Sequence, residues 1–152
     1  MRSTIPLTIA VLLTLTPISL CASGIDDKVF DQQSLDALQA KARLAQPRDQ
    51  CFIYAQLVHG LTELSLRQYA AGDVANATIL LKQIQPLAQK IHLSMAGGDK
   101  RLKDAEILLR HTAFRLTEML HSTSYEDRPL VEQTLAQVTQ AQNQAMMQVF
   151  SK

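Results

Sequence analysis

The chain has 152 residues, and its 15 Lys and Arg residues against 14 Asp and Glu residues give a formal net charge of +1. Balanced charge without a basic run provides no electrostatic basis for binding nucleic acid or an anionic membrane surface. The length is that of a single domain, which can bury a core without covalent or metal cross-links.

The N-terminus has the three-part pattern of a secretory signal peptide. Arg2 makes the start basic, residues 5–15 are mostly apolar, and residues 19–23 are mainly small. The pattern predicts an exported protein, periplasmic or secreted. The apolar run is too short for a transmembrane helix, and no later segment is long and apolar enough to be one. We place the signal peptide at 1–22, with cleavage after residue 21, 22 or 23.

The two cysteines have different expected roles. Cys21 can be the lipidated first residue of a membrane-anchored bacterial lipoprotein, although Leu20 precedes it where a small residue is usual. This anchored form is the alternative to a soluble exported protein. If Cys21 is removed, Cys51 remains alone and cannot form an internal disulfide. We expect Cys51 to be a buried thiol, and a disulfide between two chains is the alternative.

The remaining residues, 23–152, form one predicted domain that begins with a flexible leader at 23–30. A helix at about 31–45 is rich in Ala, Gln and Leu, which favour helices. A longer helix at about 48–71 is apolar on more than one face, so we expect neighbours to cover it on several sides.

The helix at about 73–96 is the most clearly bounded. Gly72 ends the preceding helix, Asp73 can cap this one, and Gly97 and Gly98 end it. Pro86 lies inside, but the apolar stripe continues past it, so we expect a kink rather than an end. Short turns at both ends predict that this helix packs against the helices before and after it. The stripe consists of Leu80, Ile84, Leu87, Ala88, Ile91 and Met95.

Two more helices follow, at about 100–121 and 129–150. The first has a core stripe and, on its opposite face, a weaker stripe made of Ile107, His111, Phe114 and Glu118. The second is rich in glutamine and has no charge between Glu132 and Lys152. Its neutral surface is either solvated or pairs with another helix. The predicted fold is all-α: an antiparallel up-and-down bundle of four long helices with an additional N-terminal helix.

The four histidines allow one chemical hypothesis, a metal- or haem-binding bundle that uses some of His59, His92, His111 and His121. Folding the helices back at their turns places His59 and His111 at the same height. The helical phase, however, places His59 opposite the main apolar face and His111 on the back of its helix, whereas bundle metal sites use inward side chains. We therefore expect partly exposed histidines, and no cofactor or metal ligand is assigned.

Other catalytic patterns are missing from the sequence. Glu118 and His121 have the spacing of a di-iron motif, but such sites need two copies and two further glutamates. There is no haem-attachment motif, no phosphate-binding glycine loop and no marked nucleophile. We therefore expect a non-enzymatic protein that interacts with a protein partner or with itself, and the histidine bundle is the alternative.

Three segments resemble exported all-helical proteins of unknown function from soil bacteria. They are Tyr54-Ala55-Gln56-Leu57-Val58-His59-Gly60, Lys90-Ile91-His92 and Arg101-Leu102-Lys103-Asp104-Ala105-Glu106. The resemblance implies an exported helical protein and carries over no activity or site residue.

Overall fold

The computed structural model describes residues 30–95 and 100–151, so the signal peptide, Cys21 and the Gly97-Gly98 stop lie outside the described residues. Within these ranges the chain is all-helical and has no strand, as predicted. Each predicted boundary that lies within them agrees to within two residues. The helices are α1 (Gln32–Leu44), α2 (Pro47–Ala70), α3 (Val74–Met95), α4 (Leu102–Ser122) and α5 (Arg128–Phe150).

Local sequence explains where α2 ends and α3 begins. Gly72 has a φ of +82°, which a residue with a side chain rarely adopts. Its N–H donates to the Tyr69 carbonyl at 3.0 Å, and the Asp73 N–H donates to the Gln68 carbonyl at 2.9 Å. These two bonds form a Schellman motif. The Asp73 carboxylate then accepts from the backbone N–H of Asn76 at 3.2 Å, which confirms the predicted cap of α3.

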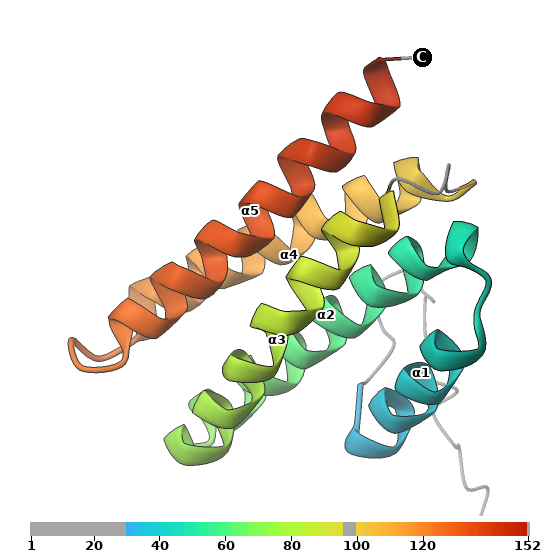
Figure 1. Cartoon of the computed structure of the whole chain (residues 1–152). Helices are drawn as coiled ribbons and strands as arrows, with labels where there is room; N and C mark the ends of the chain where they lie inside the picture. Colours follow the sequence, from blue (N-terminus) through green and yellow to red (C-terminus); the bar gives the residue numbers. More distant parts are fainter. Residues whose placement is uncertain (1–29, 96–99, 152) are drawn as a thin grey trace, which may run out of the picture.

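The four long helices form two hairpins, α2–α3 and α4–α5, which lie against each other (Figure 1). Within the described residues α2 contacts α1, α3 and α4, whereas α3 packs against α2 and α5 and makes at most marginal contact with α4. The prediction that α3 packs against both of its sequence neighbours was therefore wrong on the α4 side. A short loop keeps the end of one helix close to the start of the next, but it does not require the two helices to pack against each other along their lengths.

The direction of α4 follows from its contacts with α2. Successive contacts join Phe52 to Arg101, His59 to Thr112 and Tyr69 to Ser124, so the numbers rise together on both helices. Helices α2 and α4 thus run parallel, while each hairpin is antiparallel. This arrangement places residues of equal height on α2 and α4 side by side.

The core runs between the hairpins and under α1. The predicted stripe of α3 faces it, with Ile84 and Ile91 fully buried, and α3 continues through Pro86 as expected. Cys51 is also fully buried, as predicted, so it is inaccessible to a second chain. Across the described ranges, no helix is both long enough and apolar enough to cross a membrane.

Some of the neutral polar side chains of α5 contact other helices of the same chain. The Gln142 amide donates to Glu106 of α4 at 2.9 Å, and Gln144 lies 2.7 Å from Nδ1 of His92 on α3. Other polar residues of this helix, such as Gln133 and Gln140, are exposed. The helix thus has both a solvated side and polar contacts to its own neighbours. Its C-terminal end extends beyond the other helices (Figure 1).

Candidate functional site

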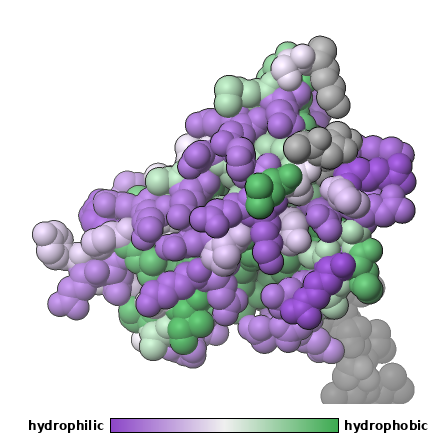
Figure 2. Space-filling view, in the orientation of Figure 1, coloured by the Kyte–Doolittle hydropathy of each residue, from purple (hydrophilic) through white to green (hydrophobic). Residues whose placement is uncertain are grey.

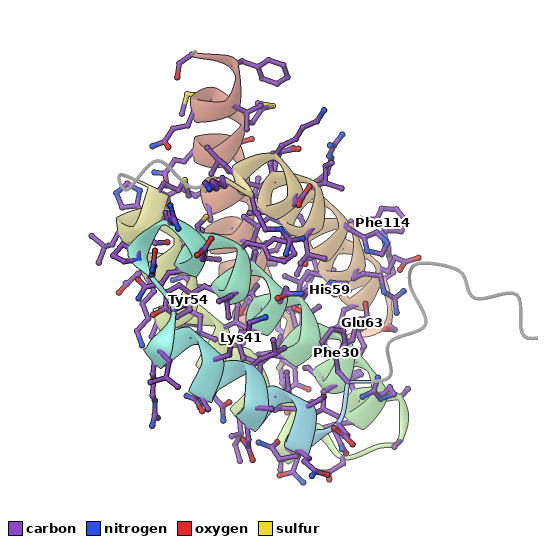
Figure 3. All side chains as sticks on the ribbon, turned by 90° about the vertical axis from the view of Figure 1, so that its right-hand side faces the viewer. Phe30, Lys41, Tyr54, His59, Glu63 and Phe114 are labelled. Atoms are coloured by element: carbon purple, nitrogen blue, oxygen red, sulfur yellow. The ribbon has the colours of Figure 1, made fainter. Side chains whose placement is uncertain are left out.

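A groove of about 580 Å³ opens between the start of α1, the middle of α2 and the first half of α4. Its residues combine aromatic, basic and imidazole side chains from elements far apart in sequence. They are Phe30, Phe52, Gln56, His59, Arg101, Asp104, Ile107, Leu108, Arg110 and His111. Figure 3 shows Phe30, His59 and Glu63 in this part of the molecule, with Phe114 on α4 beside them.

His59 is buried, with 9% of its surface exposed, so the prediction that it is a partly exposed surface residue was wrong. The reason is that α1, α3 and α4 all pack on α2, so the side opposite its main apolar face is also covered. His59 Nδ1 lies 3.0 Å from the Thr112 hydroxyl, and that hydroxyl donates its proton to the Leu108 carbonyl at 2.8 Å. With the hydroxyl proton on the Leu108 carbonyl, Nδ1 of His59 is the donor in its contact with Thr112.

His111 lies directly against His59. The ring centroids are 5.5 Å apart and the ring planes are inclined by 37°. The edge of Phe30 packs on the other side of His59, with centroids 5.8 Å apart and planes at 86°. The predicted common height of His59 and His111 is confirmed, whereas the phase argument that kept them apart was wrong. The argument failed because α4 packs on the side of α2 that the helical period predicted to face solvent.

The other two histidines lie elsewhere. His92 is exposed on α3 and contacts Gln144 of α5, and His121 is exposed at the end of α4. Glu118, which shares the di-iron spacing with His121, forms an ion pair with Arg115 instead. Among the residues that the structure describes, no three His, Cys, Asp or Glu side chains are grouped closely enough to hold a metal ion.

An ion pair joins α2 to α4 one helical turn beyond His59. Arg115 donates to both carboxylate oxygens of Glu63, at 2.7 and 3.1 Å. Burial raises the pKa of Glu63, but the hydrogen bonds and charge of Arg115, together with His59 and His111, outweigh it and lower this pKa. The same hydrogen bonds raise the pKa of Arg115, although burial opposes them. Both groups therefore stay ionised near neutral pH.

The charged groups along the α4 side of the groove also have partners. Arg101 lies over the Phe52 ring, 3.5 Å from its centroid, and donates to Asp104 at 3.0 Å. Glu106 is buried and accepts from Arg110 at 3.0 Å, as well as from the amide of α5 described above. The sequence analysis missed Glu106 and Thr112 as buried polar residues. A signal existed for Thr112, because a helical Thr can bond the carbonyl four residues earlier and so occupy an apolar face.

Two apolar side chains of the weaker α4 stripe remain uncovered. Ile107 is 48% exposed and Phe114 is 59% exposed, one on each side of His111 along the helix. Helix α1 covers α2 rather than this stripe. Much of the surface in Figure 2 is hydrophilic, with apolar side chains gathered in separate areas. The α4 stripe and the groove together form the candidate site.

The chain finds no match among protein family models, curated proteins or solved structures.

Proposed function

We propose that this protein is exported and acts without catalysis, by binding a second protein chain on the α4 side of the groove. The observation that carries the proposal is the exposure of Ile107 and Phe114 beside a groove with an apolar lining. Ile107 and Phe114 lie two turns apart on the same face of α4, so their exposure together beside the groove favours a contact surface. The partner is either another protein or a second copy of this chain.

The non-enzymatic part of the proposal rests on how the polar groups of the site are used. Glu63 is held by Arg115, Glu106 by Arg110, and Asp104 by Arg101. A general base needs a carboxylate or imidazole whose pKa lies near the working pH, and Arg115 lowers the pKa of the Glu63 carboxylate. Cys51, which is the cysteine among the described residues, is buried and therefore inaccessible to a substrate.

A photo-crosslinking amino acid at Phe114 tests the contact surface. Ile79 on α3 is the matched control, because it is 54% exposed on the other hairpin. We expect a crosslinked species in the exported fraction for the label at Phe114 and none for the label at Ile79. Mass spectrometry of the species distinguishes a homodimer from a complex with another protein. Equal crosslinking at both positions, or none at either, would contradict the proposed surface.

A pair of charge substitutions provides an independent test. Ile107→Glu with Phe114→Glu should abolish the crosslinked complex or, for a self-associating chain, shift the mass measured by light scattering to that of the monomer. Ile79→Glu should leave both unchanged. A wild-type protein that stays monomeric at every concentration and captures no partner would refute this function.

Export is tested on the N-terminus of the protein itself. Intact-mass analysis of material from the exported fraction should show that 21 to 23 residues have been removed, in line with the signal-peptide pattern. A chain that begins at a lipidated Cys21 would instead support the membrane-anchored alternative. An uncleaved chain retained in the cytoplasm would contradict export.

A further inference from the structure

A second exposed apolar surface lies at the C-terminal end of α5. It consists of Met146, Met147 and Phe150, whose side chains are 37%, 61% and 80% exposed, and we call it the α5 tip. Gln144 makes the contact with α3 described above, and Phe150 lies about 9 Å further along the helix axis. The tip therefore extends beyond the other helices, as Figure 1 shows.

The tip is also uncharged. No charged residue lies between Glu132 and Lys152, and the last turn of α5 has no basic residue. The carbonyl groups at the end of a helix carry about half a negative charge, which a Lys or Arg in the last turn can offset. Among the described residues of α5, no side chain does so. The tip thus combines exposed apolar side chains with a weakly negative helix end.

The groove has the complementary character. Its charged lining residues are two arginines, Arg101 and Arg110, and one aspartate, Asp104. Arg110 pairs with Glu106 but keeps 64% of its side chain exposed, so it is accessible to a bound molecule. The groove volume of about 580 Å³ lies within the range of about 300–1,000 Å³ for pockets that take a drug-sized ligand. A groove of this size can accept the apolar side chains of one helical turn.

We propose that the occupant of the groove and of the adjoining α4 stripe is the α5 tip of a second copy of this chain. The inference rests on the proposed function, because it names the partner that binds the α4 side of the groove. Of the nine exposed large hydrophobic side chains in the described ranges, two lie on the α4 stripe and three at the tip. One contact would cover both surfaces, with the tip against Ile107 and Phe114 and the helix end near Arg110.

The tip of the same chain cannot fill this groove. Helix α5 packs on α3 and α4, whereas the groove lies between α1, α2 and α4. In Figure 3 the end of α5, at the top of the view, lies away from Phe114 and from the labelled groove residues. A contact between two different surfaces of identical chains either joins two copies reciprocally or links copies head to tail. In both arrangements one tip meets one groove, so each side can be removed separately.

Light scattering over a concentration series measures the self-association. The wild-type mass should rise above that of the monomer. Met147→Gln with Phe150→Gln keeps the tip neutral but removes its apolar side chains, and it should weaken association by about tenfold or more. The matched control is Ile79→Gln with Leu93→Gln, because these side chains are 54% and 74% exposed on α3. The control should stay within about twofold of wild type, and circular dichroism should show both variants folded.

A mixture of two defective variants tests whether these two surfaces meet each other. Ile107→Glu with Phe114→Glu keeps the tip and lacks the groove side, whereas Met147→Gln with Phe150→Gln keeps the groove side and lacks the tip. Each variant alone should be monomeric, but an equimolar mixture should form a heterodimer through the one intact tip and the one intact groove. Arg110→Gln should weaken wild-type association by about two- to fivefold, with a larger effect at low salt.

The photo-crosslinking label at Phe114 separates this inference from the proposed function. A crosslink to the end of α5 in a second copy would support both. A crosslink to a different protein, or to another part of a second copy, would support the proposed function and overturn this inference. The absence of any crosslink would overturn both.

Three results of the scattering experiments would also overturn the inference. They are a wild-type protein that stays monomeric at every concentration, a mixture of the two variants that stays monomeric, and a control variant that is as defective as the tip variant.

Discussion

Gly60 is the position at which the docking of α1 on α2 can be tested most directly. A Cβ added there would lie 2.6 Å from Cδ2 of Leu35 and 2.6 Å from Cδ1 of Phe30. Both neighbours are buried, with 3% and 8% of their surfaces exposed. The absence of a side chain at Gly60 thus allows α1 and the residue before its cap to lie directly on the α2 backbone.

Two opposing effects set the magnitude for Gly60→Ala. Ala is favoured over Gly inside a helix by about 0.8–1.0 kcal/mol. Against this, Leu35 and Phe30 must retreat by about 0.8 Å to restore ordinary contact, and overpacking of this kind costs about 1–3 kcal/mol. The upper part of that range applies because the Phe30 ring moves as a rigid unit. We expect Gly60→Ala to lower the free energy of unfolding by about 1–2 kcal/mol.

Urea unfolding followed by circular dichroism measures this change, and hydrogen exchange of the α1 amides shows whether it is local to that helix. The control is the same substitution in a Phe30→Ala, Leu35→Ala background, which removes the clashing atoms. There Gly60→Ala should become stabilising by about 0.8–1.0 kcal/mol, since only helix propensity remains. A stabilising effect in the wild-type background, with unchanged exchange in α1, would refute the packing of α1 on α2.

Three other changes probe different parts of the fold. The pKa of Glu63 is lowered on folding, so its ion pair stabilises the protein above the unfolded pKa near 4.5, and this stabilisation is lost as the pH falls through the folded pKa. Glu63→Gln should therefore make the free energy of unfolding fall less steeply as the pH is lowered. An unchanged pH dependence would contradict the role of Arg115. Gly72→Ala should cost about 1–2 kcal/mol in urea unfolding because of its positive φ, and Gly72→Asn less; equal values would show that the left-handed turn does not matter. Cys51 should react with Ellman's reagent only as fast as the protein unfolds, and rapid labelling of native protein would contradict its burial.

The sequence by itself determined the helices of this protein, because their ends depend on local groups. A glycine that accepts a positive φ, followed by a carboxylate that can bond the next backbone N–H groups, ends α2 and starts α3 wherever the helices later pack. Prolines at the first turn of α2 and α5 act in the same local way. The burial of the α3 stripe also followed from the sequence, because its apolar face is clear, and the burial of Cys51 followed from the usual behaviour of a single cysteine.

Only the tertiary structure decided which helices are neighbours, and with that the site. The helical period describes how one helix divides its own side chains into faces, but burial depends on how many other helices surround it. Because α1, α3 and α4 all pack on α2, His59 is buried although it lies opposite the main apolar face of its helix. Because α4 runs parallel to α2 at the same height, His111 and Thr112 meet that histidine across 52 and 53 residues of sequence. Neither relation is encoded in the spacing of residues along a single helix.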